Sequence, residues 1–140
     1  MIHDRRFSRV VNILHNKLRW KIEALSFKGQ YSGSQGKALH FILMHSDDDI
    51  FQKDIEEEFG LRPPSATALL KNMEGNGLIT REPVPYDGRF KRIVPSGKAL
   101  TLRDKVVSEM DQLEAQLTRN IEPEDMRTWL KVMETMIDNI

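Results

Sequence analysis

The segment from Phe51 to Arg92, FQKDIEEEFGLRPPSATALLKNMEGNGLITREPVPYDGRFKR, has the clearest structural pattern in the chain. Its first part predicts a short helix over Gln52–Phe59, a tight turn at Gly60–Arg62, and a second helix that begins at the next two prolines. Proline is tolerated in a first helical turn, where its missing N–H would have no partner anyway. The cluster Gly75-Asn76-Gly77 ends this second helix, because glycine and asparagine favour helix termination.

The second helix has two different faces. Its apolar positions recur at helical spacing and predict the face that packs on a core; they are Ala66, Leu69, Leu70 and Met73. The opposite side is small, polar and basic, with Pro64, Ser65, Thr67, Ala68, Lys71 and Asn72. It lacks the carboxylates that usually decorate a solvated helix. Two short helices joined by a three-residue turn, the second with such a surface, are typical of a helix-turn-helix that reads a DNA major groove.

Two extended runs follow, Leu78–Glu82 and Phe90–Val94, with the polar segment Pro83–Arg89 between them. The dipeptide Asp87-Gly88 predicts a hairpin turn in which the glycine takes a positive φ. The fold class is therefore mainly α with a small β-wing (α+β), a winged helix-turn-helix.

The wing is expected to carry Arg89, with Lys91 and Arg92 at its root. Arginines at such a place can enter a minor groove and reach the flanking phosphates. The whole chain has 21 basic and 21 acidic residues, so its net charge gives no hint of a polyanionic partner. Between Arg62 and Lys98, however, seven residues are basic and three are acidic. The basic excess lies where the motif predicts DNA.

The run QKDIEEEFGLRPPSATALLKNMEGNGLITRE, together with the wing DGRFKR, resembles the MarR family of winged-helix transcriptional regulators. The resemblance implies that Asp87 braces Arg89. In place of the family's Leu-Thr-x-x-Gly, this chain has Val94-Pro95-Ser96-Gly97, in which Ser96 is expected to cap the next helix. The residues that the pattern and the resemblance together assign to DNA are Arg62, Pro64, Ser65, Thr67, Ala68, Lys71, Asn72, Asp87, Arg89, Lys91 and Arg92.

Long helices are predicted on both sides of the winged part. Residues 1–140 are expected to form a single domain with the winged helix-turn-helix at 32–95. Apolar periodicity predicts helices over about Asp4–Ser26 and Ser96–Asn120, and a last helix after Pro123. A further helix, capped by Ser34 or Ser32, is predicted to run to about His45. In the resembled family the flanking helices, here residues 1–30 and 96–140, form a homodimer.

A physical argument also favours a homodimer. One recognition helix reads only a few base pairs, which is too few to specify an operator. Two-fold symmetry places the second helix one turn away, at ~34–36 Å, so double-stranded DNA with a palindromic operator is the expected partner. A bound dimer would exclude polymerase from an overlapping promoter, and repression is therefore the default expectation.

Members of the resembled family often bind a small aromatic or anionic effector between the dimerisation helices and the winged domain. The candidate effector-binding residues here are His15, Arg19, Trp20, His40 and Met44. A second interpretation stays open, in which Trp20 and Met44 are core residues, the histidines are packing residues, and the chain has no ligand.

Other function classes have weaker support. The chain has no cysteine, which excludes disulfides and thiol switches. No signal peptide or apolar membrane segment is visible in the sequence. We therefore expect a cytoplasmic protein with no membrane contact. The histidines lack the spacing of metal ligands, and no catalytic or cofactor-binding motif is present, so no metal, no cofactor and no enzymatic activity are expected. A winged domain used only for protein contact remains the alternative, but it would favour an acidic or apolar recognition surface.

Overall fold

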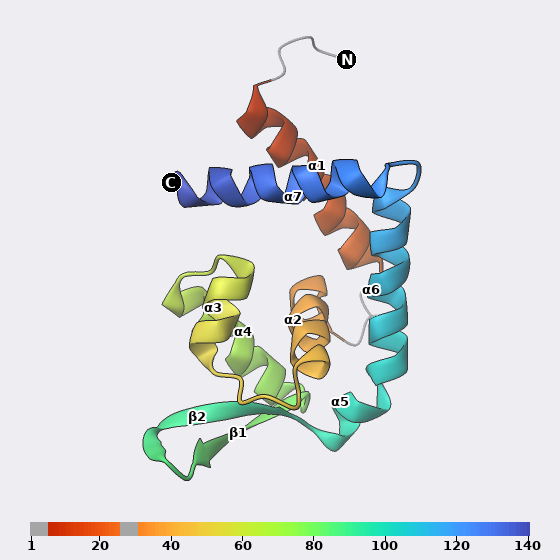
Figure 1. Ribbon diagram of the computed structural model, residues 1–140. Helices are drawn as coiled ribbons and strands as arrows, with labels where there is room; N and C mark the ends of the chain where they lie inside the picture. Colours follow the sequence, from red (N-terminus) through yellow and green to blue (C-terminus); the bar gives the residue numbers. More distant parts are fainter. Residues whose placement is uncertain (1–5, 26–30) are drawn as a thin grey trace. The chain divides into compact units, whose positions relative to one another are not determined.

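The computed structural model describes residues 6–25 and 31–140 (Figure 1). Residues up to Val107 form one compact unit, and Ser108–Ile140 form a second. The elements are α1 (Phe7–Leu25), α2 (Gly33–Met44), α3 (Gln52–Phe59), α4 (Pro63–Gly75), β1 (Ile79–Val84), β2 (Asp87–Pro95), α5 (Gly97–Thr101), α6 (Arg103–Thr118) and α7 (Pro123–Asp138). This is the winged helix-turn-helix that the sequence predicts, with α3 and α4 at their predicted bounds. The predicted helix ends at Asp4 and Ser26 lie outside the described residues.

The core of the first unit is built around α2. Its Leu39 and Ile42 are fully buried, and they belong to one apolar cluster with Ile55 of α3 and with Leu70 and Met73 of α4. The apolar stripe predicted for α4 is therefore confirmed as its core face. Because this stripe is narrow, the opposite side of α4 stays in solvent.

Local capping explains where these helices begin and end. Ser32 accepts a hydrogen bond from the backbone N–H of Gln35 and starts α2. At the start of α3, Asp54 Oδ2 accepts a hydrogen bond of 2.8 Å from the backbone N–H of Phe51. Gly60 ends α3 with φ = 60°, a left-handed conformation that glycine adopts without a steric penalty.

The contact at the start of α3 gives a stability prediction. Asp54→Ala leaves the Phe51 N–H without its carboxylate partner, and we expect the free energy of unfolding to fall by about 1 kcal/mol. Urea denaturation measures the change. The control is Glu57→Ala on the exposed side of α3, which should shift the free energy of unfolding by less than about 0.5 kcal/mol. Equal effects of the two substitutions would contradict a capping role for Asp54.

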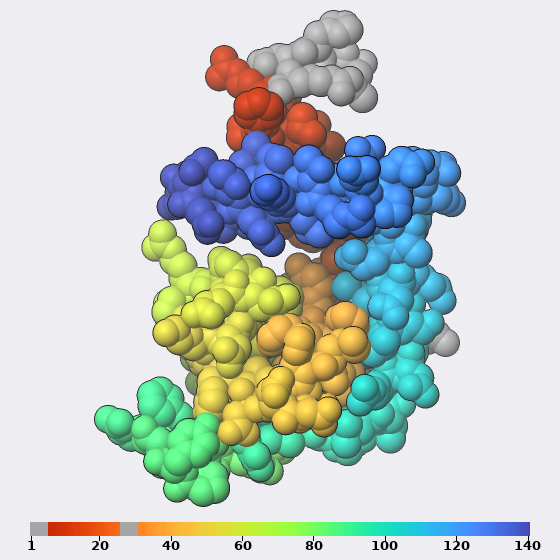
Figure 2. Space-filling view, in the orientation of Figure 1, coloured from red at the N-terminus to blue at the C-terminus, as the bar shows by residue number. Residues whose placement is uncertain are grey.

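The wing differs from the sequence prediction at its turn. Strands β1 and β2 pair antiparallel, with Val84 opposite Asp87, so the two-residue connection is Pro85-Tyr86 and not Asp87-Gly88. The positive-φ glycines among the described residues are Gly60 and Gly77, so the predicted positive φ at Gly88 is wrong. The reason is burial: Val84 is buried, and β1 continues far enough to bury it. The resulting ribbon extends away from α2–α4 (Figures 1 and 2).

The segment before α3 lies against the wing. The backbone N–H of Ile93 donates a hydrogen bond of 2.7 Å to the carbonyl of Ile50. The segment that precedes α3 therefore pairs briefly with the wing at Ile50. It attaches β2 to the start of α3.

The C-terminal helices also differ from the prediction. One helix was expected over Ser96–Asn120, but Leu102 separates α5 from α6. Ser96 caps α5, as expected, by accepting a hydrogen bond from Ala99 N–H. The break lets both Ala99 and Leu102 contact the core. Leu100, between these two residues, is half exposed.

Helix α7 has no buried residue. Its side chains Trp129, Leu130 and Ile137 are exposed. Within residues 6–25 and 31–140, no helix is long and apolar enough to cross a membrane.

Candidate nucleic-acid interface

The outward side of α4 is the first part of the candidate interface. Every residue that the sequence assigned to this surface is exposed: Arg62, Pro64, Ser65, Thr67, Ala68, Lys71 and Asn72. None of them is acidic. A surface of small and polar side chains with one lysine can enter a groove without meeting charge repulsion from phosphates.

Gln52 of α3 is a site residue that the sequence did not reveal. Its Nε2 donates a hydrogen bond of 2.9 Å to Thr67 Oγ1, and it also lies 3.4 Å from the carbonyl oxygen of Pro63 and 3.2 Å from Glu56 Oε2. Since Thr67 accepts this bond, its own hydroxyl proton is free to be donated outward. Gln52 therefore orients Thr67 and ties α3 to the first turn of α4.

Asp87 and Arg89 form the second part of the interface. Arg89 donates three hydrogen bonds to the Asp87 carboxylate: its backbone N–H at 3.0 Å and Nε at 3.2 Å to Oδ1, and Nη2 at 3.1 Å to Oδ2. The bracing implied by the resemblance is therefore present. The Arg89 side chain remains 85% exposed. Its guanidinium is thus held in one orientation yet remains open to a partner.

The same contact changes the acidity of the carboxylate. Hydrogen bonds from the Arg89 side chain, and then from its backbone N–H, hold the pKa of Asp87 below its ordinary value. A carboxylate with a lowered pKa stays charged as the pH falls, and the contact is lost only when the pH drops through that lowered pKa. The brace is therefore complete at neutral pH.

We expect Arg89→Ala to raise the pKa of Asp87, because both causes of the lowering come from residue 89 and the side-chain contribution is the larger. Following the carboxyl carbon of Asp87 by NMR across a pH series measures this change. Arg92→Ala is the control, since Arg92 contacts other carboxylates. A midpoint for Asp87 that is the same in wild type and Arg89→Ala would contradict the assigned cause.

Arg92 forms ion pairs within the protein that the sequence did not predict. Its Nη2 lies 3.1 Å from Glu82 Oε2, and its Nη1 lies 3.4 Å from Asp49 Oδ1. Asp49 also accepts a hydrogen bond of 3.1 Å from the Tyr86 hydroxyl. Desolvation, followed by this hydrogen bond, raises the pKa of Tyr86. Arg92 thus joins the root of the wing to the segment before α3, and its contact with DNA stays a prediction.

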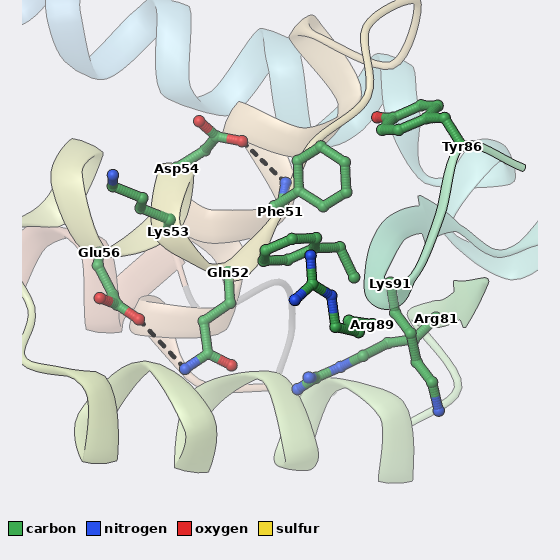
Figure 3. A pocket seen from close by; sticks show the side chains of 10 residues that line it. Phe51, Gln52, Lys53, Asp54, Glu56, Arg81, Tyr86, Arg89 and Lys91 are labelled. Atoms are coloured by element: carbon green, nitrogen blue, oxygen red, sulfur yellow. Dashed lines mark hydrogen bonds between the residues drawn. The ribbon is translucent and has the colours of Figure 1, made fainter. Parts of the chain in front are cut away.

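An open hollow of about 590 Å³ lies between α3 and the wing (Figure 3). Arg81, Arg89 and Lys91 line it from the wing, and Lys53 lines it from α3. The ring of Phe90 packs edge-on against Phe51 at 6.2 Å between centroids, and the Arg89 guanidinium lies 5.9 Å from the centroid of Phe90. Four cations against two carboxylates make this hollow basic, and the aromatic pair holds the wing against α3.

The candidate effector residues lie on α1 and α2. Trp20 and Met44 are 63% and 52% exposed, so the interpretation that placed them in the core is wrong. Arg19 and His15 are also exposed, and His40 is partly buried. The effector itself stays a prediction.

Comparison with known proteins identifies this architecture. A sequence model of the MarR family matches residues 30–89. The crystal structure of the transcription regulator MarR from Oenococcus oeni PSU-1 is 26% identical, with a TM-score of 0.88 over 95% of this chain and 99% of that chain. Residues 30–89 of the chain thus match the MarR family, and the chain has the fold of a MarR regulator. An uncharacterised HTH-type transcriptional regulator of Bacillus subtilis strain 168, YdgJ, is 22% identical over 120 residues, which are 86% of this chain and 73% of that protein.

Other MarR-fold structures were determined with DNA. The S. aureus MepR–DNA complex has a TM-score of 0.87, with 20% identity and 99% of both chains covered. A MarR family regulator from Listeria monocytogenes, complexed with 26mer DNA, has a TM-score of 0.84 with 17% identity, over 97% of this chain and 89% of that chain. At these identities the likeness establishes only the fold of this chain.

Proposed function

We propose that this chain is a sequence-specific regulator of the MarR family that binds double-stranded DNA as a homodimer on a palindromic operator and represses transcription. The observation that carries the proposal is the pairing of two surfaces. Helix α4 exposes a side free of carboxylates, and the adjacent wing holds Arg89 by three hydrogen bonds while leaving its side chain exposed. The DNA complexes of proteins with the same fold support this assignment.

The proposed DNA contacts fall into two groups, those that read bases and those that attract phosphates. Ser65, Thr67 and Asn72 are the base readers, since hydroxyl and amide groups recognise base edges in a major groove. Lys71, Arg89 and Lys91 supply the positive charge that phosphates attract.

Homodimerisation is supported by apolar side chains of α1 and α7 that are exposed to solvent. On α1, the side chains of Phe7, Val10 and Val11 are exposed and recur at helical spacing. Helix α7 exposes Trp129 and Leu130. Contiguous apolar surface on helices is a sign of an interface with another chain.

Release by a small aromatic or anionic effector completes the proposal. Arg19 offers a cation and Trp20 an exposed ring, and these two groups suit such a molecule. A molecule bound at α1 or α2 would relieve repression by favouring a spacing of the two recognition helices that the operator does not fit.

Selection from random-sequence DNA tests the proposal. Full-length protein is expected to enrich a palindrome whose half-site centres lie about 10 base pairs apart, the spacing that two recognition helices in successive major grooves require. Enrichment of no sequence would contradict the proposal. In that case the chain would be a winged-helix module for protein contact.

A further inference from the structure

The C-terminal end of α4 is held by a polar junction that none of the DNA-binding assignments uses. Asn76 Nδ2 donates a hydrogen bond of 2.8 Å to Gln35 Oε1 of α2, and Lys98 Nζ of α5 donates a bond of 3.0 Å to the carbonyl of Asn76. Next to it, Ser96 Oγ donates a bond of 2.6 Å to the carbonyl of Gly77. The end of the recognition helix is thus tied to both α2 and α5.

Gln35 is the notable member of this junction. Within the part of the chain that the structure describes, it is the one polar side chain classed as buried, at 8% exposure. A buried amide costs free energy unless it is hydrogen-bonded, so an apolar residue would be the simpler choice for stability. What the amide adds is direction, because a hydrogen bond fixes an orientation that apolar packing leaves free to slide.

The position of Gln35 connects α4 to α1. Two residues earlier, Gly33 lies so close to α1 that a Cβ there would be 2.8 Å from Ile22 Cγ2. Ile22 is itself buried. The first turn of α2 therefore contacts α1 on one side and binds the end of α4 on the other.

The length of α4 turns a small tilt into a large displacement. Its 13 residues span about 20 Å at 1.5 Å per residue. A tilt of about 10° at the Asn76 end would move the other end by about 3.4 Å, which is the rise of one base pair.

We propose that Gln35 and Asn76 are positioning residues whose hydrogen bond fixes the tilt of α4 relative to α1 and so sets the half-site spacing that the dimer accepts. This inference rests on the proposed function, because spacing has meaning only for a dimer on a two-part operator. Neither residue is assigned to contact DNA. Their loss is expected to relax the choice of spacing while leaving the affinity for a single half-site unchanged.

The experiment uses full-length protein and an operator selected by the wild type. Fluorescence anisotropy compares this operator with duplexes that have one base pair added or removed between the half-sites, and with an isolated half-site. We expect wild type to favour the selected spacing by about tenfold and Gln35→Met, which removes the acceptor but keeps the shape, to favour it by less than about threefold.

Two further variants test the same hydrogen bond from its other partner and control for the Gln→Met substitution itself. Asn76→Ala changes an exposed residue, should fold even if Gln35→Met does not, and is expected to relax the spacing in the same way. Gln116→Met makes the same substitution as Gln35→Met at an exposed glutamine of α6 and should behave as wild type. Thermal unfolding of each variant separates loss of stability from loss of spacing preference.

The outcomes distinguish the inference from the proposed function. Variants that keep the wild-type preference for spacing overturn the inference. So does a wild type that binds a palindrome but accepts all three spacings, although the proposed function then stands. A wild type that selects no palindrome overturns both.

Discussion

Arg89→Ala is expected to weaken operator binding by about 10- to 100-fold, because each of the two wings in a dimer loses one preorganised cation. The two hydrogen bonds from the Arg89 guanidinium to Asp87 fix its orientation before DNA arrives, so little side-chain entropy remains to be lost on binding. The slope of log affinity against log salt should become shallower by about two, one unit for each arginine. Fluorescence anisotropy across a salt series measures both effects.

Two further variants separate the effect of the Arg89 contact from the effect of losing one positive charge. Arg127→Ala removes the same charge from an exposed position of α7 and should stay within about threefold of wild type. Arg89→Lys keeps the charge but cannot form the two-pronged contact with Asp87, and an intermediate affinity is expected. An Arg89→Ala protein that binds as tightly as Arg127→Ala would rule out the wing as a DNA contact.

Val10→Asp is expected to convert the dimer to a monomer. Val10 is 48% exposed and lies on the stripe of α1 that also exposes Phe7 and Val11, so the monomer loses little packing when it is changed. In a dimer, the new carboxylate would be buried without a partner. Since the second recognition helix no longer binds within the same complex, operator affinity should fall by about 10²- to 10⁴-fold.

Sedimentation velocity measures the oligomeric state, and thermal unfolding shows whether the monomer stays folded. Asn12→Asp is the control, because it places a carboxylate on the opposite side of α1 at an exposed position. A Val10→Asp protein that remains a dimer with full affinity would place the interface elsewhere, and the exposed side of α7 would be the next surface to test.

The parts of this fold that sequence predicted are those set by local spacing. The core face of α4 follows from apolar residues three and four positions apart, and its outward face is what remains. The capping roles of Ser96 and Gly60 depend on neighbours within a few residues. These features need no knowledge of the rest of the chain.

The parts that sequence missed depend on contacts between distant segments. Gln52 and Thr67 are 15 residues apart, and Arg92 meets Asp49 across 43 residues. The turn of the wing lies at Pro85-Tyr86 and not at the predicted Asp87-Gly88 for a similar reason. Burial of Val84 extends β1 to that residue, which the local Asp-Gly signal does not reveal.

Sequence alone also could not tell what the apolar stripes of α1 and α7 pack against. Periodicity identified apolar stripes on both helices, but a stripe that packs in a core and a stripe that meets another chain have the same spacing. Exposure of Trp129 and Val10 in the structure is what separates the two cases.

Sequence-specific binding can be measured as the affinity of wild-type protein for its selected operator and for a scrambled duplex of equal length across a salt series. With Lys71, Arg89 and Lys91 engaged in each half of a dimer, we expect log affinity for the operator to fall with log salt at a slope of about −5. At near-physiological salt the operator should bind at least about 10³-fold more tightly than the scrambled duplex. Equal affinity for the two duplexes, or binding to neither, would contradict the account of this chain as a sequence-specific DNA-binding regulator.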